Sequence, residues 1–168
     1  MHRWQARIQR LPMVALILAD PHAERTFDAS PAQVFAAFAT REGKARWFAG
    51  TPGSWDETER LFDFRVGGRE RRVGTWQNGM VTTFDACYWD IPQDRRIVYS
   101  YGMHLNDLRI SVSLAIIEFA AAGAGTRLRI TEQGAFLNGY HDGGSRERGT
   151  NELIDKLEST LHSATAID

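Results

Sequence analysis

The sequence predicts an α+β domain in which a long antiparallel sheet is covered by one C-terminal helix. Apolar residues recur at helical spacing near residues 31–48, and then alternate with polar residues from about residue 60 to residue 134. Turn residues interrupt this alternation at short intervals, which is typical of antiparallel strands joined by hairpins. Residues 145–162 carry one apolar face, and they form the only predicted helix long enough to cover the sheet.

The length of 168 residues fits one domain with one core. We expect residues 1–20 to form an N-terminal extension or an extra strand, residues 21–163 one domain, and residues 164–168 a tail. The net charge of -1 predicts neither nucleic-acid nor membrane binding, and the apolar run at residues 13–19 is too short for a membrane span. Cys87 is the single cysteine, which favours a reducing cytoplasm.

The first elements of the domain are a strand and two short helices. Residues 22–28 are predicted to be extended, and Ser30 followed by Pro31 supplies an N-cap and a first helical residue. A second short helix precedes the aromatic pair at residues 47–48. The first helix has an apolar stripe formed by Val34, Phe35 and Phe38.

The strands of the sheet follow. Phe62, Phe64 and Val66 alternate with charged residues and are assigned to the core, before a turn at residues 67–68. Asn78-Gly79 marks a hairpin between strands at residues 71–77 and 81–91. Later strands have apolar alternation at the following residues: Ile97, Tyr99, Tyr101 and Met103, then Ile110, Val112, Leu114 and Ile116.

The C-terminal helix is predicted to begin at Ser145, which can act as its cap, and to run to about residue 162. Gly149 within it costs about 1 kcal/mol in helix propensity relative to alanine, so we expect a close approach to the sheet or to a ligand there. The apolar face consists of Leu153, Ile154, Leu157 and Leu161.

Glu132 is the most informative single residue. Strand alternation in residues 125–134 places it on the same face as Leu128 and Ile130, where an unpaired charge is costly. The carboxylate is therefore paired with an arginine, lies at a bend at the strand end, or lines a cavity. In a cavity its pKa would rise, and it would serve as a ligand anchor or a general acid/base.

Aromatic residues supply the other candidates for a pocket, because tyrosine and tryptophan combine an apolar body with a polar atom. The candidate ligand-binding residues are Trp47, Phe48, Trp76, Tyr88, Tyr99, Tyr101, Met103, Glu132 and Phe136. The alternative for most of these aromatic residues is an ordinary core.

Other charged segments give weaker signals. The basic run at residues 69–72 is interpreted as solvated surface. His104, His141 and Asp142 lack the spacing of metal ligands, so we predict neither a metal site nor a cofactor. His104 is expected near the rim of the pocket.

Several short motifs resemble, in their order, one bacterial protein family. They are ASPAQVF at residues 29–35, WF at 47–48, FRVGG at 64–68, DIPQDRRIV at 90–98, GTRL at 125–128 and GTNELIDKL at 149–157. The set resembles bacterial proteins similar to the C-terminal domain of the heat-shock-protein ATPase activator. That family lies within the START-like (SRPBCC), birch-pollen-allergen-like superfamily. The resemblance covers about residues 22–162.

The resemblance implies a helix-grip fold: a curved antiparallel sheet wrapped around a long C-terminal helix, with two short helices after the first strand and an internal cavity. It also implies a homodimer. Our leading hypothesis is that a small hydrophobic or amphipathic molecule binds between the sheet and the helix. One alternative is a cyclase, hydrolase or lyase that uses Glu132 as acid/base. Another is a chaperone-cofactor or stress-linked interaction module, although no residue pattern supports a chaperone partner.

Overall fold

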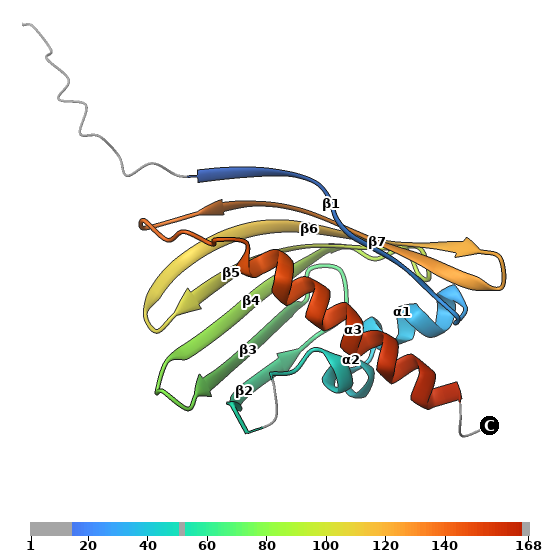
Figure 1. Cartoon of the computed structure of the whole chain (residues 1–168), viewed down its shortest axis with the longest axis horizontal. Helices are drawn as coiled ribbons and strands as arrows, with labels where there is room; N and C mark the ends of the chain where they lie inside the picture. The colour runs from blue at the N-terminus through green and yellow to red at the C-terminus, as the bar shows by residue number, and fades with distance from the viewer. Residues whose placement is uncertain (1–14, 51–52, 166–168) are drawn as a thin grey trace, which may run out of the picture.

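The structure of the protein, a computed structural model, describes residues 15–50 and 53–165. Its elements are β1 (Ala15–Phe27), α1 (Pro31–Ala39), α2 (Arg41–Trp47), β2 (Trp55–Phe62), β3 (Arg69–Trp76), β4 (Val81–Asp90), β5 (Arg96–Leu105), β6 (Leu108–Ala122), β7 (Gly125–Phe136) and α3 (Ser145–Thr165). The strands form one antiparallel sheet in the order β1-β7-β6-β5-β4-β3-β2. Figure 1 shows the sheet curving around α3, which crosses its hollow face. The predicted α+β helix-grip fold is confirmed.

The edge strand β1 begins within the segment that was expected to be an extension or an extra strand. Residues 15–20 belong to the same strand as residues 22–27, and the whole strand pairs with β7. Residues 1–14, the rest of that segment, lie outside the described residues. At the other end of the chain, α3 continues to Thr165, into the segment expected to be a tail.

The helix α1 starts as predicted and its stripe lies in the core. The Ser30 hydroxyl accepts a hydrogen bond from the Gln33 backbone N–H at 3.3 Å, and the Gln33 side chain accepts one from the Ser30 N–H at 2.9 Å. These two bonds form a capping box, which satisfies two backbone donors at the helix start. The core cluster also contains Val34, Phe35, Phe38, Ile154 and Leu157.

The strand predicted at Phe62, Phe64 and Val66 lies earlier in the chain. The strand β2 ends at Phe62, and residues 63–68 form a loop that reverses the chain with Gly67 at a φ of 78°. Val66 is 59% exposed in this loop, so its assignment to the core is wrong. Phe64 packs against the core from the loop, which imitates the alternation of a continuing strand.

The strand β6 contains an irregularity that changes which residues face inward. Met103 pairs with Ser111 while His104 pairs with Arg109, so Ile110 is the extra residue of a bulge. Beyond it, Ser111, Ser113, Ala115 and Ile117 are buried, whereas Val112 and Leu114 are 42% and 39% exposed. Of the apolar alternation that predicted this strand, Ile110 is therefore buried, whereas the residues from Val112 onward lie along the outer face.

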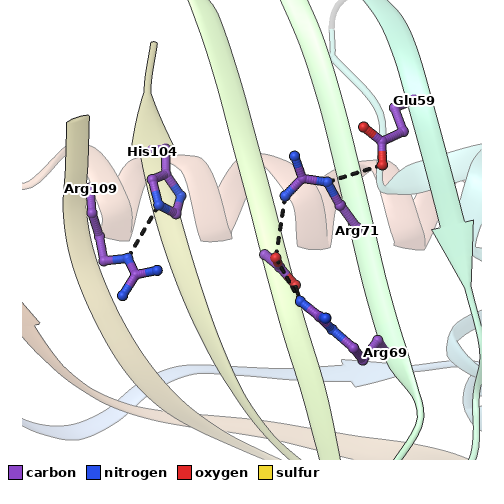
Figure 2. A network of polar contacts seen from close by, with 6 residues as sticks. Glu59, Arg69, Arg71, His104 and Arg109 are labelled. Carbon is purple, nitrogen blue, oxygen red and sulfur yellow. Dashed lines mark hydrogen bonds and ion pairs between the residues drawn. The ribbon is translucent and has the colours of Figure 1, made fainter. Parts of the chain in front are cut away.

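The outer face of the sheet, opposite α3, carries a network of polar contacts (Figure 2). Arg71 bonds to Glu59 at 3.0 Å and to Asp85 at 3.2 Å, and Arg69 bonds to Asp85 at 2.8 Å. The Arg109 Nε donates to His104 Nε2 at 3.2 Å. His104 thus lies on the outer face, so its expected place at the pocket rim is wrong.

Candidate functional site

A cavity of about 610 Å³ lies between the hollow face of the sheet and α3. Its walls come from all three described helices and from strands β2 to β7, and they include eleven aromatic side chains. Pockets that hold small molecules typically have volumes of about 300–1,000 Å³ and mostly apolar walls. The cavity therefore has the size and lining of a small-molecule site.

Most of the candidate residues meet at this cavity. Those that line it are Trp47, Phe48, Trp76, Tyr88, Tyr99, Tyr101 and Met103. Glu132 and Phe136 are not part of the lining; both instead contact the guanidinium of Arg146. Ligand contact by any of these residues stays a prediction.

Three tyrosines form one wall. The Tyr99 ring lies 5.9 Å from the Tyr88 ring and 5.8 Å from the Tyr101 ring, measured between centroids. Burial raises the pKa of all three phenols, and nearby negative charge adds to the effect. The outer two hydroxyls donate to buried carboxylates at 2.5 Å, Tyr88 to Glu70 and Tyr101 to Glu132. Tyr99 lies between these two residues and also lines the cavity.

Lys44, from α2, ends in a buried polar cluster at one end of this wall. Its Nζ forms an ion pair with Glu70 and donates to the Tyr88 hydroxyl at 3.3 Å. Lys44 is 7% exposed and Glu70 is 2% exposed. The ammonium also lies 5.0 Å from the centroid of the Phe48 ring. Burial lowers the pKa of Lys44, and the opposite charge of Glu70 counteracts part of that effect.

Arg146, in the first turn of α3, forms a second cluster at the other end. Its Nη1 donates to Glu132 at 2.8 Å and to Ser113, and its Nη2 donates to Ser111 at 2.6 Å. The Tyr101 hydroxyl donates to the same Glu132 oxygen. Glu132 thus faces inward, as the alternation of side chains along its strand predicts, and it is paired with an arginine. The two serines that accept hydrogen bonds from Arg146 face inward because of the bulge in β6.

A third cation, Arg72 of β3, lines the cavity beside α2. Its guanidinium pairs with Glu57 and lies 5.0 Å from the Phe48 ring and 5.2 Å from the Trp55 ring. Burial lowers the pKa of Arg72, and the hydrogen bond to Glu57 opposes this shift.

Sequence interpretation missed these cations. The run at residues 69–72 was assigned to the surface, but Glu70 and Arg72 are buried while Arg69 and Arg71 face outward. Strand alternation predicts that Glu70 and Arg72 both point inward, since successive side chains point to opposite faces. No local pattern marks Arg146, because its partners come from distant strands.

Two further features of the lining bear on ligand binding. The Trp76 Nε1 is buried and has no hydrogen-bond partner within residues 15–50 and 53–165. Gly149 of α3 also lines the cavity, and a Cβ built on it would meet no atom within 4 Å. The close approach to the sheet expected at Gly149 is therefore wrong, because the helix faces open space there.

Residues 15–50 and 53–165 contain no group of three or more His, Cys, Asp or Glu side chains arranged to hold a metal ion. None of the helices in the same ranges has the length and apolar character needed to cross a membrane.

A family model described as Activator of Hsp90 ATPase homolog 1-like protein matches residues 28–162. The chain belongs to this family. The Activator of Hsp90 ATPase homolog 1-like match runs from the end of β1 into the last turns of α3, so it includes every element that lines the cavity. No curated protein sequence matches the chain significantly.

Solved structures of bacterial proteins are similar to this family member. An uncharacterised protein from Rhizobium leguminosarum is 39% identical with a TM-score of 0.79, and the match covers 90% of this chain and 95% of that one. The Mll3558 protein from Rhizobium loti is 38% identical with a TM-score of 0.76, covering 88% and 96% of the two chains. Protein CV1439 from Chromobacterium violaceum, 20% identical with a TM-score of 0.65 over 88% and 96%, shares the fold.

Proposed function

We propose that this protein binds a small, largely apolar ligand in the cavity between the sheet and α3. One observation carries the proposal: a cavity of about 610 Å³ has aromatic walls and one buried polar group, the Trp76 indole N–H, without a partner among the described residues. Aromatic walls supply affinity through apolar contact, and a few polar groups orient the bound molecule. The single cysteine keeps the cytoplasm as the predicted location.

The contacts of Glu132 favour binding over catalysis by this carboxylate. A general acid/base must reach the proton that it transfers, directly or through one water. Glu132 instead bonds to Arg146 and Tyr101 and does not line the cavity. It therefore acts on a ligand through these two neighbours, which do line the cavity. A START-like enzyme that uses Glu132 as acid/base is the weaker alternative.

A role in protein contacts has separate support from the outer face. Trp89, Val112 and Leu114 are 57%, 42% and 39% exposed there, on the strands β4 and β6 that flank β5. Ser100 of β5 accepts from Trp89 and pairs with Leu114, which brings these side chains to one region. Exposed apolar side chains that lie together are common at contact surfaces. The homodimer or interaction module expected from the resemblance would use this face. Native mass spectrometry of wild type and Leu114→Asp tests it, with loss of a dimer in the variant as the expected result.

The test of ligand binding uses Gly149, since side chains added there enter the cavity. We expect the uncharged fluorescent probe N-phenyl-1-naphthylamine to bind wild type saturably. Gly149→Phe should weaken binding on the order of tenfold or more by filling the space. Gly149→Ala is the matched control and should retain binding.

Both variants should be at least as stable as wild type, because glycine is the poorer helix former. Thermal unfolding measured on the same samples separates blocked binding from damaged folding. If a stable Gly149→Phe protein binds the probe as wild type does, the cavity is not the binding site. If wild type binds neither this probe nor other apolar molecules, the proposed function is wrong.

A further inference from the structure

Three ion pairs border the cavity, and they share one orientation. In each pair the cation is part of the cavity lining and the carboxylate is not. The pairs are Lys44 with Glu70, Arg72 with Glu57, and Arg146 with Glu132. At these three places a ligand meets the positive end of an ion pair, in surroundings of low dielectric where charge acts strongly. The lining also includes Asp142, which accepts hydrogen bonds at the start of α3, and Glu152 on α3.

The positive charge is in excess at the α2 end. Arg60 lies 3.3 Å from Glu57, which it shares with Arg72. Among the described residues, Lys44, Arg60 and Arg72 thus pair with only two carboxylates, Glu57 and Glu70. Burial is the largest cause that lowers the pKa of Lys44, and the positive charges of Arg72 and Arg60 lower it further. An anion placed here would relieve that repulsion.

Lys44 and Arg72 both lie against the ring of Phe48. The Lys44 Nζ and the Arg72 guanidinium each lie 5.0 Å from the Phe48 ring centroid, and all three residues line the cavity. Phe48 in turn lies 5.3 Å from Phe84, and Phe84 lies 5.1 Å from Tyr101 of the tyrosine wall. The charged end of the cavity is therefore continuous with its aromatic wall.

A second polar atom of the cavity lies about 13 Å farther along β3 and is also a donor, without a partner among the described residues. The indole N–H of Trp76 can only donate a hydrogen bond, and Trp76 lies four residues after Arg72 on the same face of β3. A ligand group with acceptor oxygens would satisfy it. A ligand that carried only donors would leave it unsatisfied, which is costly for a buried group.

We propose that the ligand is a carboxylic acid whose carboxylate lies between Lys44 and Arg72 and whose apolar body lies along the tyrosine wall. This inference rests on the proposed function, because it names the class of molecule held in the same cavity. A guanidinium matches the planar shape of a carboxylate, and an ammonium adds a point charge. The adjoining wall is aromatic, so a single anionic group suits this end of the site.

The test compares two ligands of equal shape, 2-naphthylacetate and 2-naphthylacetamide, by calorimetric titration of the whole protein. In wild type the acid should bind on the order of tenfold or more tighter than the amide, the strength of a charge-assisted contact. Lys44→Met with Glu70→Gln removes the ammonium without stranding the carboxylate, and the amide oxygen introduced by Glu70→Gln can still accept from Tyr88. In this double variant the acid-to-amide ratio should fall toward one.

A matched control removes an ion pair from the outer face. Arg71→Gln with Glu59→Gln makes the same change of charge and should leave the ratio as in wild type. Equal binding of acid and amide by wild type overturns the inference and leaves the proposed function standing. Binding of neither ligand counts against the proposed function itself. An unchanged ratio in a folded Lys44→Met, Glu70→Gln protein that still binds the amide overturns the assigned position.

Discussion

The two faces of the sheet hold similar ion pairs in different surroundings. On the outer face, the Arg71 side chain is 35% exposed and is shared between Glu59 and Asp85 (Figure 2). On the inner face, the Arg146 side chain is 15% exposed and binds Glu132 together with two serines. Water can replace any lost contact of Arg71, whereas the partners of Arg146 are buried.

This difference shows what each arrangement can do. Exposed ion pairs contribute little to stability, because solvent screens them and their side chains lose freedom. Buried pairs are costly to break, because removal of one partner leaves a desolvated charge. The inner pairs also hold their cations in fixed positions at the cavity wall, which is how a ligand site is preorganised.

The largest expected effect is at the most buried pair. Lys44→Met leaves Glu70 buried with only the Tyr88 hydroxyl, so the free energy of unfolding should fall by about 3–5 kcal/mol. Lys44→Met with Glu70→Gln should recover most of this loss, since no charge is left unpaired. Urea unfolding monitored by circular dichroism measures both. Equal losses in the single and double variants would show that the charge itself is not what matters.

A pair of identical substitutions compares the two faces directly. Arg146→Gln should cost about 1.5–3 kcal/mol, since it breaks charge-assisted bonds to Glu132 and the serines. Arg71→Gln should cost about 1 kcal/mol or less. Chemical unfolding of both proteins under one salt condition gives the comparison. A larger loss at Arg71 than at Arg146 would contradict the distinction between the faces.

The prediction with the smallest effect near neutral pH concerns the titration of Tyr99. Burial raises the pKa of Tyr99 in the folded protein, so above about pH 10 the unfolded chain loses this proton first. Stability therefore falls as the pH rises beyond about 10, by about 1.4 kcal/mol per pH unit for each such tyrosine. Tyr99→Phe should reduce the fall in stability above about pH 10 by about 1.4 kcal/mol per pH unit, the contribution of one tyrosine.

Unfolding measured at several pH values between about 8 and 12 tests the slope. The lowered pKa of Lys44 acts in the opposite direction below its ordinary value of 10.5, and it is common to both proteins. Its contribution therefore cancels in the comparison. Identical slopes for wild type and Tyr99→Phe would show that this phenol ionises equally in both states.

Much of the fold could be predicted from local pattern. The capping box at Ser30, the hairpin at Asn78-Gly79 and the apolar face of α3 depend on neighbours within a few residues, which the sequence displays. The fold class followed from the order of these elements. Val66 was misplaced because a loop that returns an aromatic side chain to the core has the same alternation as a strand.

The candidate site was predictable in part. Strand parity placed Glu132 inward and brought Tyr99, Tyr101 and Met103 to one wall, because side chains on a strand alternate until a bulge intervenes. Beyond the bulge at Ile110, the residues of β6 that face inward are the opposite set, and two of them are the serines that accept hydrogen bonds from Arg146. No periodic pattern contains an extra residue of this kind.

By itself the sequence determined the elements, their order and the inward carboxylate, since these depend on short-range spacing. Only the tertiary structure decided the partners. Glu132 and Arg146 come from different elements, and Lys44, Glu70 and Tyr88 meet from α2, β3 and β4. Long-range pairing depends on how the sheet curves around α3, which no local window of residues encodes. Because of that curvature, charged residues from separate elements meet at one cavity, and Lys44, Arg72 and Arg146 line it.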